Sequence, residues 1–372
     1  MKKSDKLQSL LFIVYIAAMF VLFIATPDRE FSELENRMLE QVPSFSAEAL
    51  SSKKFTFAFE GYTTDQFPFR DFWIPLKARI EILSGKHENN GIYLGRDGAL
   101  YERFSTPDAS RIEYNVEIVN ALTDSVTIPV YFALIPSSAE IFSDMLPDNA
   151  PCDSQAEVID TIYAGLDATT IDVFGALRGH SDEYIFYRTD HHWTSLGAYY
   201  AYTALTDAMD IEPETDFDRR VVSDSFYGAV YSSSAITWVE PDSVEIFREP
   251  SEGVTVSKLS RGSFIDSPVY AFEFLEKKDK YSMFMGGNTG LLQIHTENAD
   301  SPSLLILRDS FTDSLIPFLL PHFSELHVLD LRYYPMNLKL SDYIAEHNPD
   351  MMLICYGLHN FGVDNFIFRM AE

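Results

Sequence analysis

Two short segments contain the residue types that an acyl-transfer site needs. The first, residues 187–202, has the sequence YRTDHHWTSLGAYYAY and places Asp190 and His192 just before a helix start expected at Thr194 or Ser195. On such a loop the carboxylate can accept a hydrogen bond from the imidazole Nδ1–H, which leaves Nε2 free as a base. The alternative is that Asp190 only caps the helix while the histidines pack or bind water.

The second segment contains a candidate nucleophile. Residues 303–320, SLLILRDSFTDSLIPFLL, predict a buried parallel strand that ends at Arg308, with Ser310 in the turn before a helix. A serine in such a turn is exposed at the carboxyl edge of a sheet, where backbone N–H groups can stabilise an oxyanion. A simple N-cap at Asp309 or Ser310 is the alternative. Together the two segments favour catalysis over these structural roles.

The same motifs resemble those of a known family. DHHW at residues 190–193 and RDSF at residues 308–311 resemble the DHHW protein family, which is similar to SGNH-hydrolase-like polysaccharide O-acetyltransferases, including those that modify alginate. In those enzymes a D-x-H-W segment precedes a G-D-S-F segment, and this chain has that order. Three further segments also match: FSELENRML at 31–39, DQFPFRDFW at 65–73 and DLRYY at 330–334.

The resemblance implies a role for each residue of the site. Ser310 would be the nucleophile, His192 the base and Asp190 the residue that orients it. The chain departs from the family pattern because Arg308 replaces the glycine of G-D-S and no G-x-N-D segment supplies the oxyanion asparagine. The remaining substrate-binding or oxyanion candidates are Asn288, Arg332, Tyr333, Asn360 and Trp193. An ordinary hairpin turn around Asn288 and a surface ion pair for Arg332 are the alternatives.

The elements around these motifs predict an α/β fold, an SGNH-hydrolase-like sheet with helices on both faces, because buried strands alternate with helical stretches. Strand-like pieces from about 210 to 280 predict an antiparallel β insertion or lobe beside the sheet. Ser137 and Ser138 also follow a strand, but no histidine is close in sequence. The expected domains are an anchor (1–27), a helical N-terminal extension (28–89) and a catalytic domain (90–372).

The amino terminus predicts a transmembrane helix. Lys2, Lys3 and Lys6 precede an apolar run from Leu7 to Thr26 that is nearly as long as a bilayer is thick. Because acidic residues follow the run, we expect a single pass through the cell membrane with the catalytic domain outside the cytoplasm. A cleaved secretion signal and a buried core helix are the alternatives.

Composition limits the partners. With 28 Lys and Arg against 56 Asp and Glu, the net charge of -28 argues against nucleic acid. The same charge favours a neutral or cationic glycan over a strongly anionic one. Cys152 and Cys355 show no metal-binding spacing, so we expect no metal and no cofactor, while a single disulfide stays open.

The predicted activity is extracytoplasmic acetyl transfer through an acyl-Ser310 intermediate to a cell-surface or exported polysaccharide. The resemblance implies a membrane O-acyltransferase partner that supplies the acetyl group. The alternatives are a carbohydrate esterase, a non-catalytic glycan-binding or assembly component of the same fold, and a metal-dependent phosphoesterase that uses Asp190, His191 and His192 as ligands.

Overall fold

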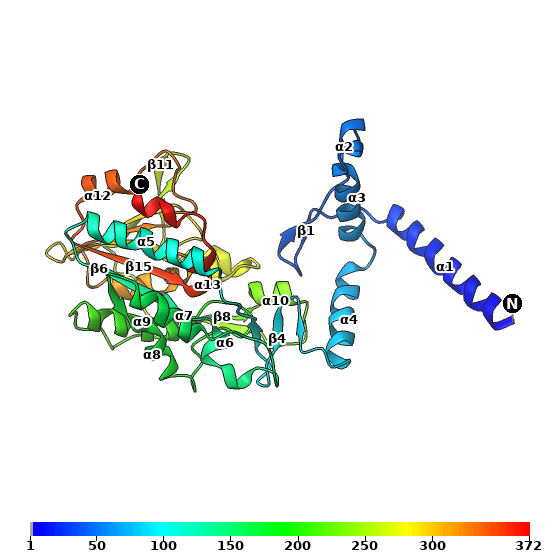
Figure 1. Cartoon of the computed structure of the whole chain (residues 1–372), viewed down its shortest axis with the longest axis horizontal. Coiled ribbons are helices and arrows are strands. Elements are labelled where there is room, and N and C mark those ends of the chain that lie inside the picture. The colour runs from blue at the N-terminus through cyan, green and yellow to red at the C-terminus, as the bar shows by residue number, and fades with distance from the viewer. Residues whose placement is uncertain (1–2) are drawn as a thin grey trace. The chain divides into compact units, whose positions relative to one another are not determined.

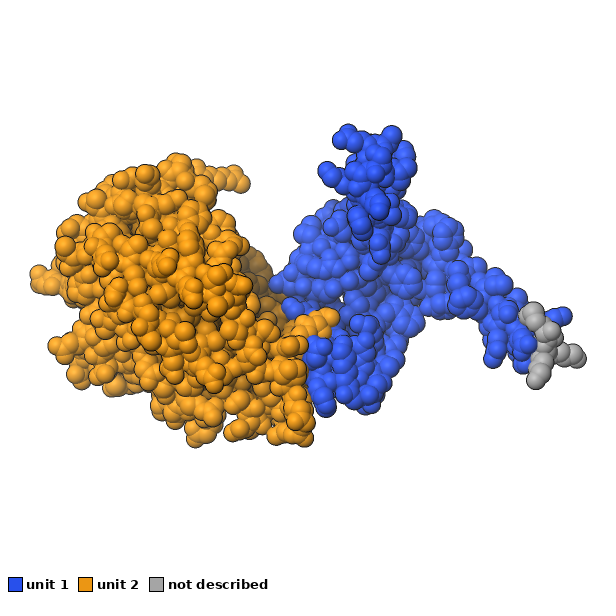
Figure 2. Space-filling view, in the orientation of Figure 1, with its two compact units in different colours: residues 1–89, 232–237 blue, residues 90–231, 238–372 orange. Residues whose placement is uncertain are grey.

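The computed structural model describes residues 3–372, and the chain forms two compact units. Unit 1 extends to residue 89 and includes residues 232–237, and unit 2 comprises residues 90–231 and 238–372 (blue and orange in Figure 2). Both motifs singled out in the sequence lie in unit 2.

Unit 1 begins with an exposed apolar helix, α1 (Lys3–Ala25; Figure 1). The most apolar part of this helix, within Ser4–Ala25, has a mean hydropathy of 2.5 and none of it is buried, so length and composition allow the helix to cross a membrane. The helix therefore fits a single-pass anchor or a signal sequence. Lys2 lies outside the described residues.

Short elements make up the rest of unit 1. Within the expected helical extension, residues 47–65 form two helices, because Lys53 between them has a left-handed φ of 62°. The elements are β1 (Phe31–Ser32), β2 (Arg37–Met38), α2 (Ala47–Ser51), α3 (Lys54–Asp65), α4 (Arg70–Leu83) and β3 (Glu88–Asn89).

Unit 2 is built on an eight-stranded sheet with the order β11-β10-β12-β14-β13-β15-β6-β7. The strands from β14 to β7 run parallel to one another, and β12, β10 and β11 add on as an antiparallel edge. Their bounds are β6 (Val130–Ile135), β7 (Thr169–Ile171), β10 (Thr255–Ser260), β11 (Ser263–Ser267), β12 (Leu291–His295), β13 (Ser303–Arg308), β14 (Glu325–Leu329) and β15 (Met351–Gly357).

Helices cover both faces of this sheet, which confirms the expected α/β fold. Alternate residues of β13 enter different cores: Leu304 and Ile306 pack on one face, Leu305 and Leu307 on the other. Figure 1 shows α5 and α9 on opposite sides of β6 and β15. Helices of the first face are α8 (Val173–Arg178), α9 (Ser195–Ala208) and α11 (Ile316–Leu319); those of the second are α5 (Ala109–Ser125), α7 (Gln155–Ala164), α12 (Leu340–His347) and α13 (Leu358–Val363).

The segment from 210 to 280 contains antiparallel strands, as expected, but part of it extends the main sheet. Only β8 (Arg220–Phe226) and β9 (Asp242–Ile246) form a ribbon of their own, whereas β10 pairs with β12 and extends the main sheet. The buried Val256 of β10 lies opposite Ile294 of β12, so this edge shares the core of the sheet. Within the range of strand-like pieces, residues 272–276 form a 3-10 turn instead, η2 (Phe272–Glu276).

The chain around Asn288 does not form the expected hairpin. A 3-10 turn, η3 (Tyr281–Met283), precedes β12 in place of a strand. Met285, Gly286 and Gly287 follow with positive φ values of 59°, 75° and 83°, which are incompatible with the extended backbone of a β-strand.

The remaining short elements are β4 (Ile92–Leu94), β5 (Leu100–Glu102), α6 (Ser138–Ile141), η1 (Ser143–Met145), α10 (Ala229–Ser234), η4 (Ser310–Ser314) and η5 (Ile367–Ala371).

Candidate active site

Ser310 lies at the carboxyl edge of the sheet, two residues after β13 ends. Asp309 caps the following turn, because its Oδ1 accepts a hydrogen bond from the Phe311 N–H at 3.0 Å. The turn that Ser310 opens is the 3-10 helix η4, and α11 follows it, so the single long helix expected here is two short pieces. The hydroxyl is thereby presented above the parallel strands, where ligands of open α/β sheets bind.

Asp190 and His192 lie on a loop before α9 that is closed by a bridge between Phe186 and Trp193. Thr194 is the N-cap of α9, as the sequence predicts, and its Oγ1 accepts from the Gly197 N–H. The bridge and the cap fix both ends of the loop. Its polar residues are therefore held in place by local structure.

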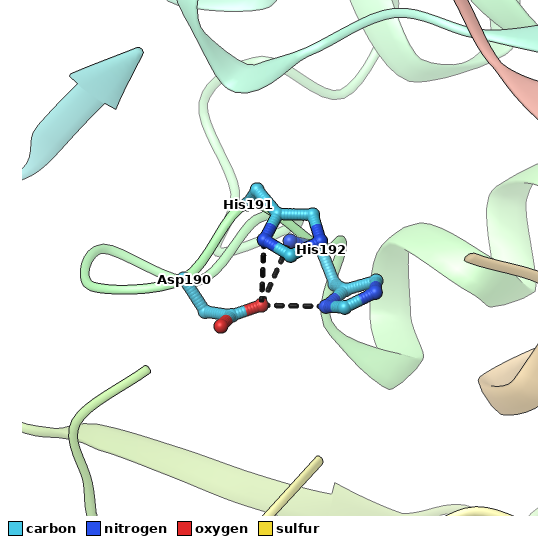
Figure 3. Close-up of side chains that lie close together, drawn as sticks. All are labelled: Asp190, His191 and His192. Atoms are coloured by element: carbon cyan, nitrogen blue, oxygen red, sulfur yellow. Dashed lines mark hydrogen bonds and ion pairs between the residues drawn. The ribbon is translucent and has the colours of Figure 1, made fainter. Parts of the chain in front are cut away.

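The three predicted triad residues meet, although 118 residues separate His192 from Ser310. Asp190 Oδ1 is 2.6 Å from His192 Nδ1, and a dashed line joins this pair in Figure 3. His192 Nε2 is 2.9 Å from Ser310 Oγ. The same Asp190 oxygen also accepts from the His192 N–H, and its other oxygen accepts from the Ala229 N–H at 2.8 Å. Carboxylate, imidazole and hydroxyl thus form one hydrogen-bonded line.

The charges in this line suit a base. Burial lowers the pKa of His192 to about 4, and neighbouring His191 acts in the same direction. Burial alone would raise the pKa of Asp190, but the two histidines and the hydrogen bonds from His192 and Ala229 outweigh it and the pKa is lowered. At neutral pH the site therefore contains an ionised Asp190 and a neutral His192 with Nε2 directed at the serine.

Two buried aromatic residues hold the parts together. Trp193 donates from Nε1 to the Phe311 carbonyl at 3.0 Å and to Ser314 Oγ at 2.9 Å, so it ties the His192 loop to the serine turn. Tyr281 stacks on His192 and donates from its hydroxyl to the Ser310 carbonyl. Sequence reasoning missed Tyr281, because no motif or spacing connects residue 281 to either segment.

Asn360 is the asparagine that the structure brings to the site. Its Nδ2 donates to Asp309 Oδ2 at 2.7 Å, and the Gly357 N–H donates to the same oxygen at 2.8 Å. Burial raises the pKa of Asp309 while these hydrogen bonds oppose the shift. An amide nitrogen carries two hydrogens, so Asn360 retains a second donor.

A cavity of about 130 Å³ adjoins the triad, and its wall contains both polar and aromatic side chains. Residues that line it include Arg103, Ser137, His191, Phe311, His359 and Asn360. The rival Ser137 lies in this wall, and its Oγ accepts a hydrogen bond from Gln155 Nε2 at 2.6 Å, so its partner there is an amide rather than a histidine.

Three other predicted residues are either exposed or paired with another residue. Asn288 is exposed and does not line the cavity. Arg332 donates from Nε and Nη2 to Asp330 at 2.9 and 2.6 Å, and because the Asp330 side chain is fully buried, this is not the surface ion pair that the sequence left as its alternative. The Tyr333 side chain is 52% exposed.

Arg308, which replaces a glycine of the expected motif, points into the protein. Its side chain is fully buried and forms an ion pair with Asp313, with Nη2 3.0 Å from Oδ1. Its Nη1 donates to Asp313 Oδ2 and to the Asp309 carbonyl. Arg308 thus stabilises the turn around Ser310 through contacts with Asp309 and Asp313.

Comparison with known proteins identifies the family. The model of the DHHW protein family matches residues 86–329, a range that contains all three triad residues. This chain belongs to the DHHW protein family. The family match confirms the resemblance that the two motifs and their order indicated.

Curated relatives resemble this DHHW protein over part of their length. The "Probable alginate O-acetylase AlgJ" of Pseudomonas aeruginosa is 29% identical over 179 residues, which are 43% of this chain and 44% of that protein. The protein of the same name from Pseudomonas fluorescens is 25% identical over 185 residues, 46% and 47% of the two chains. This chain thus spans less than half of the length of these curated relatives.

Two solved structures share the fold of this DHHW protein. A DHHW family protein from Eubacterium siraeum superposes with a TM-score of 0.64 at 22% identity, over 76% of this chain and 95% of that one. Bacillus cereus PatB1, determined with a sulfonyl adduct, superposes with a TM-score of 0.63 at 21% identity, over 76% and 98%. At this identity the likeness describes the fold.

Proposed function

We propose that this DHHW protein is a polysaccharide O-acetyltransferase that works through an acetyl-Ser310 intermediate. The observation that carries the proposal is the continuous hydrogen-bonded line from Asp190 through His192 to Ser310, with separations of 2.6 and 2.9 Å. This is the arrangement that activates a serine hydroxyl for acyl transfer.

The proposed first step forms the acyl-enzyme. Ser310 Oγ attacks the carbonyl carbon of the acetyl donor while its proton passes to His192 Nε2, and Asp190 stabilises the resulting imidazolium. The tetrahedral intermediate collapses, and the leaving group departs with the proton from His192. In the second step a sugar hydroxyl gives its proton to His192 Nε2 and attacks the acetyl carbon, which releases Ser310 and the sugar acetate.

Asn360 is the proposed side-chain donor to the oxyanion. It is bonded to Asp309, the residue before the nucleophile, and its second amide hydrogen is available toward the cavity that it lines. Backbone N–H groups at the start of η4 would supply the other donors. We do not propose this role for Asn288, which is exposed.

The names of the relatives support a polysaccharide acceptor, since two of them are described as alginate O-acetylases. The net charge of -28 favours a neutral or cationic glycan for this chain. We further propose that α1 anchors the protein with unit 2 outside the cytoplasm, where a membrane O-acyltransferase supplies the acetyl group.

The hydrogen bonds also bear on the phosphoesterase alternative. Both ring nitrogens of His192 are engaged, Nδ1 by Asp190 and Nε2 by Ser310, so a metal ion at this imidazole would have to displace one of these partners. This pairing favours acyl transfer over a ligand set formed by Asp190, His191 and His192.

The test uses the full chain in detergent, with p-nitrophenyl acetate as donor. Chito-oligosaccharides, their de-N-acetylated forms and alginate oligomers serve as acceptors, and acetylated sugars are measured by mass spectrometry. We expect sugar acetate from the intact chain and from Ser137→Ala, a matched variant of a cavity serine, and none from Ser310→Ala. Free acetate without sugar acetate would identify an esterase, and equal transfer by Ser310→Ala would overturn the proposal.

A further inference from the structure

A second cluster of ionisable side chains lies at the opposite end of the sheet from Ser310. Glu325 and His327 alternate on β14 and therefore point to one face, and His295 of β12 lies directly opposite Glu325 in the strand register. Tyr343 and His347 of α12, one helical turn apart, contact His327 over the same face. Three separate elements thus converge.

The cluster is remote from the triad. Glu325 pairs with Ser303, the first residue of β13, whereas Ser310 follows the last residue of that strand. At about 3.3 Å per residue, seven residues of extended chain correspond to roughly 20 Å. The cluster therefore has no part in the acyl-transfer geometry.

Distances in the cluster match those between ligands of one metal ion. His327 Nε2 is 3.2 Å from Glu325 Oε1, and His295 Nδ1 is 3.5 Å from the same oxygen. Tetrahedral zinc with bonds of about 2.0–2.1 Å separates its ligand atoms by about 3.3–3.4 Å. One ligand atom each from Glu325, His327 and His347 lies within 4.8 Å of the other two.

The surroundings orient His327 as a metal-binding histidine is usually oriented. Its Nδ1 lies 2.6 Å from the Tyr343 hydroxyl, which also accepts from Gln293 Nε2 at 3.1 Å. When Nε2 binds a metal ion, the neutral imidazole carries its hydrogen on Nδ1, and the Tyr343 phenol oxygen is placed to accept a hydrogen bond from it. His327 is buried, while the Glu325 side chain is 31% exposed, so an ion can enter from solvent.

We propose that Glu325, His327 and His347 bind a zinc-class divalent transition metal, with His295 or a water as fourth ligand. Two imidazoles with one carboxylate suit zinc, whereas magnesium and calcium prefer oxygen ligands throughout. The ion would join β14 and α12, so its role is to stabilise this end of unit 2. Because binding to the folded chain alone shifts the unfolding equilibrium, metal should raise the melting temperature.

The test is a zinc titration of the full chain in detergent, after chelator treatment and dialysis, followed by calorimetry and by thermal unfolding. We expect one tight zinc equivalent, a raised melting temperature, and visible absorption of tetrahedral Co²⁺ when cobalt replaces zinc. His347→Ala, at the end of a surface helix, and Glu325→Gln should each weaken binding by at least about tenfold.

Two control variants separate this site from others. His180→Ala removes a histidine that pairs with Glu183 at 2.9 Å outside either metal-capable cluster, and His191→Ala removes one from the triad loop. Both should bind zinc as the intact chain does. Absence of binding by the intact chain, binding retained by both His347→Ala and Glu325→Gln, or binding lost in His191→Ala would overturn the proposal.

Discussion

The ring of Tyr281 lies flat against the imidazole of His192, with ring centroids 3.7 Å apart and planes 7° from parallel. The hydroxyl of the same tyrosine donates to the Ser310 carbonyl at 3.0 Å. One buried side chain from η3 therefore contacts the proposed base and the proposed nucleophile, and it shields one face of the imidazole from water.

Tyr281→Phe should reduce acyl transfer several-fold while retaining the stacked ring. The lost hydroxyl holds the serine turn, and removal of one such hydrogen bond costs about 1 kcal/mol. Turnover of p-nitrophenyl acetate and urea unfolding measure the two effects. Tyr270→Phe is the matched control, because its hydroxyl donates to the Arg248 carbonyl at 2.9 Å away from the triad. Equal loss of turnover in the two variants would contradict the role of Tyr281.

Activity should persist to unusually low pH. Burial holds the pKa of His192 at about 4, and the imidazole acts as a base only when it is unprotonated. We expect kcat/KM to be flat near neutral pH and to fall on the acid side with a midpoint near 4, below the ordinary histidine value of about 6.5. The midpoint should rise in His191→Ala. A profile centred at or above 6.5 in the folded intact chain would contradict this account.

Asp190→Asn should lower kcat by on the order of 10³–10⁴ with little change in KM. The neutral amide cannot stabilise the imidazolium. Its NH₂ group also replaces one of the two carboxylate oxygens that accept hydrogen bonds from His192 and Ala229. Steady-state kinetics measure the effect, and circular dichroism confirms that the variant is folded. A loss of less than tenfold would show that Asp190 does not orient the base.

Gly228→Ala should inactivate the site although it replaces none of the three triad residues. A Cβ at this position would lie 2.3 Å from Asp190 Cβ and Oδ2, so the carboxylate must shift. We expect activity to fall by about 100-fold or more, with a stability cost of about 1–3 kcal/mol from overpacking. Gly179→Ala is the control, since its Cβ would meet only backbone oxygens at 3.5 and 3.6 Å. Normal turnover in Gly228→Ala would contradict the claim that close packing against Gly228 holds the Asp190 carboxylate in position.

The sequence predicted the parallel part of the sheet because its strands are short apolar runs between helical segments. It also predicted that Asp190, His192 and Ser310 would come together, because each lies in a local motif whose loop or turn the flanking elements fix. The place of β10 between β11 and β12 was harder to predict: its pairing with β12 is a long-range contact, and apart from the buried Val256 its residues are exposed or only partly buried.

Residues that support the site escaped prediction for the same reason. Tyr281 and Gly228 contact the triad from segments that carry no catalytic motif, so only tertiary packing shows their positions. Arg308 departs from the family motif, and its role could not be predicted because nothing in the sequence pattern marks Asp313 as its buried ion-pair partner. The Glu325, His327 and His347 cluster likewise spans two elements at a spacing that matches no common metal motif.

The most direct test of the central claim is the mass of the Ser310 peptide after brief incubation of the full chain with p-nitrophenyl acetate and a rapid acid quench. We predict that one acetyl group is found on Ser310, that it is absent in Ser310→Ala, and that Ser137→Ala still carries it. Turnover that continues in Ser310→Ala, with no acetyl group on Ser310 in the intact chain, would contradict the acyl-serine mechanism.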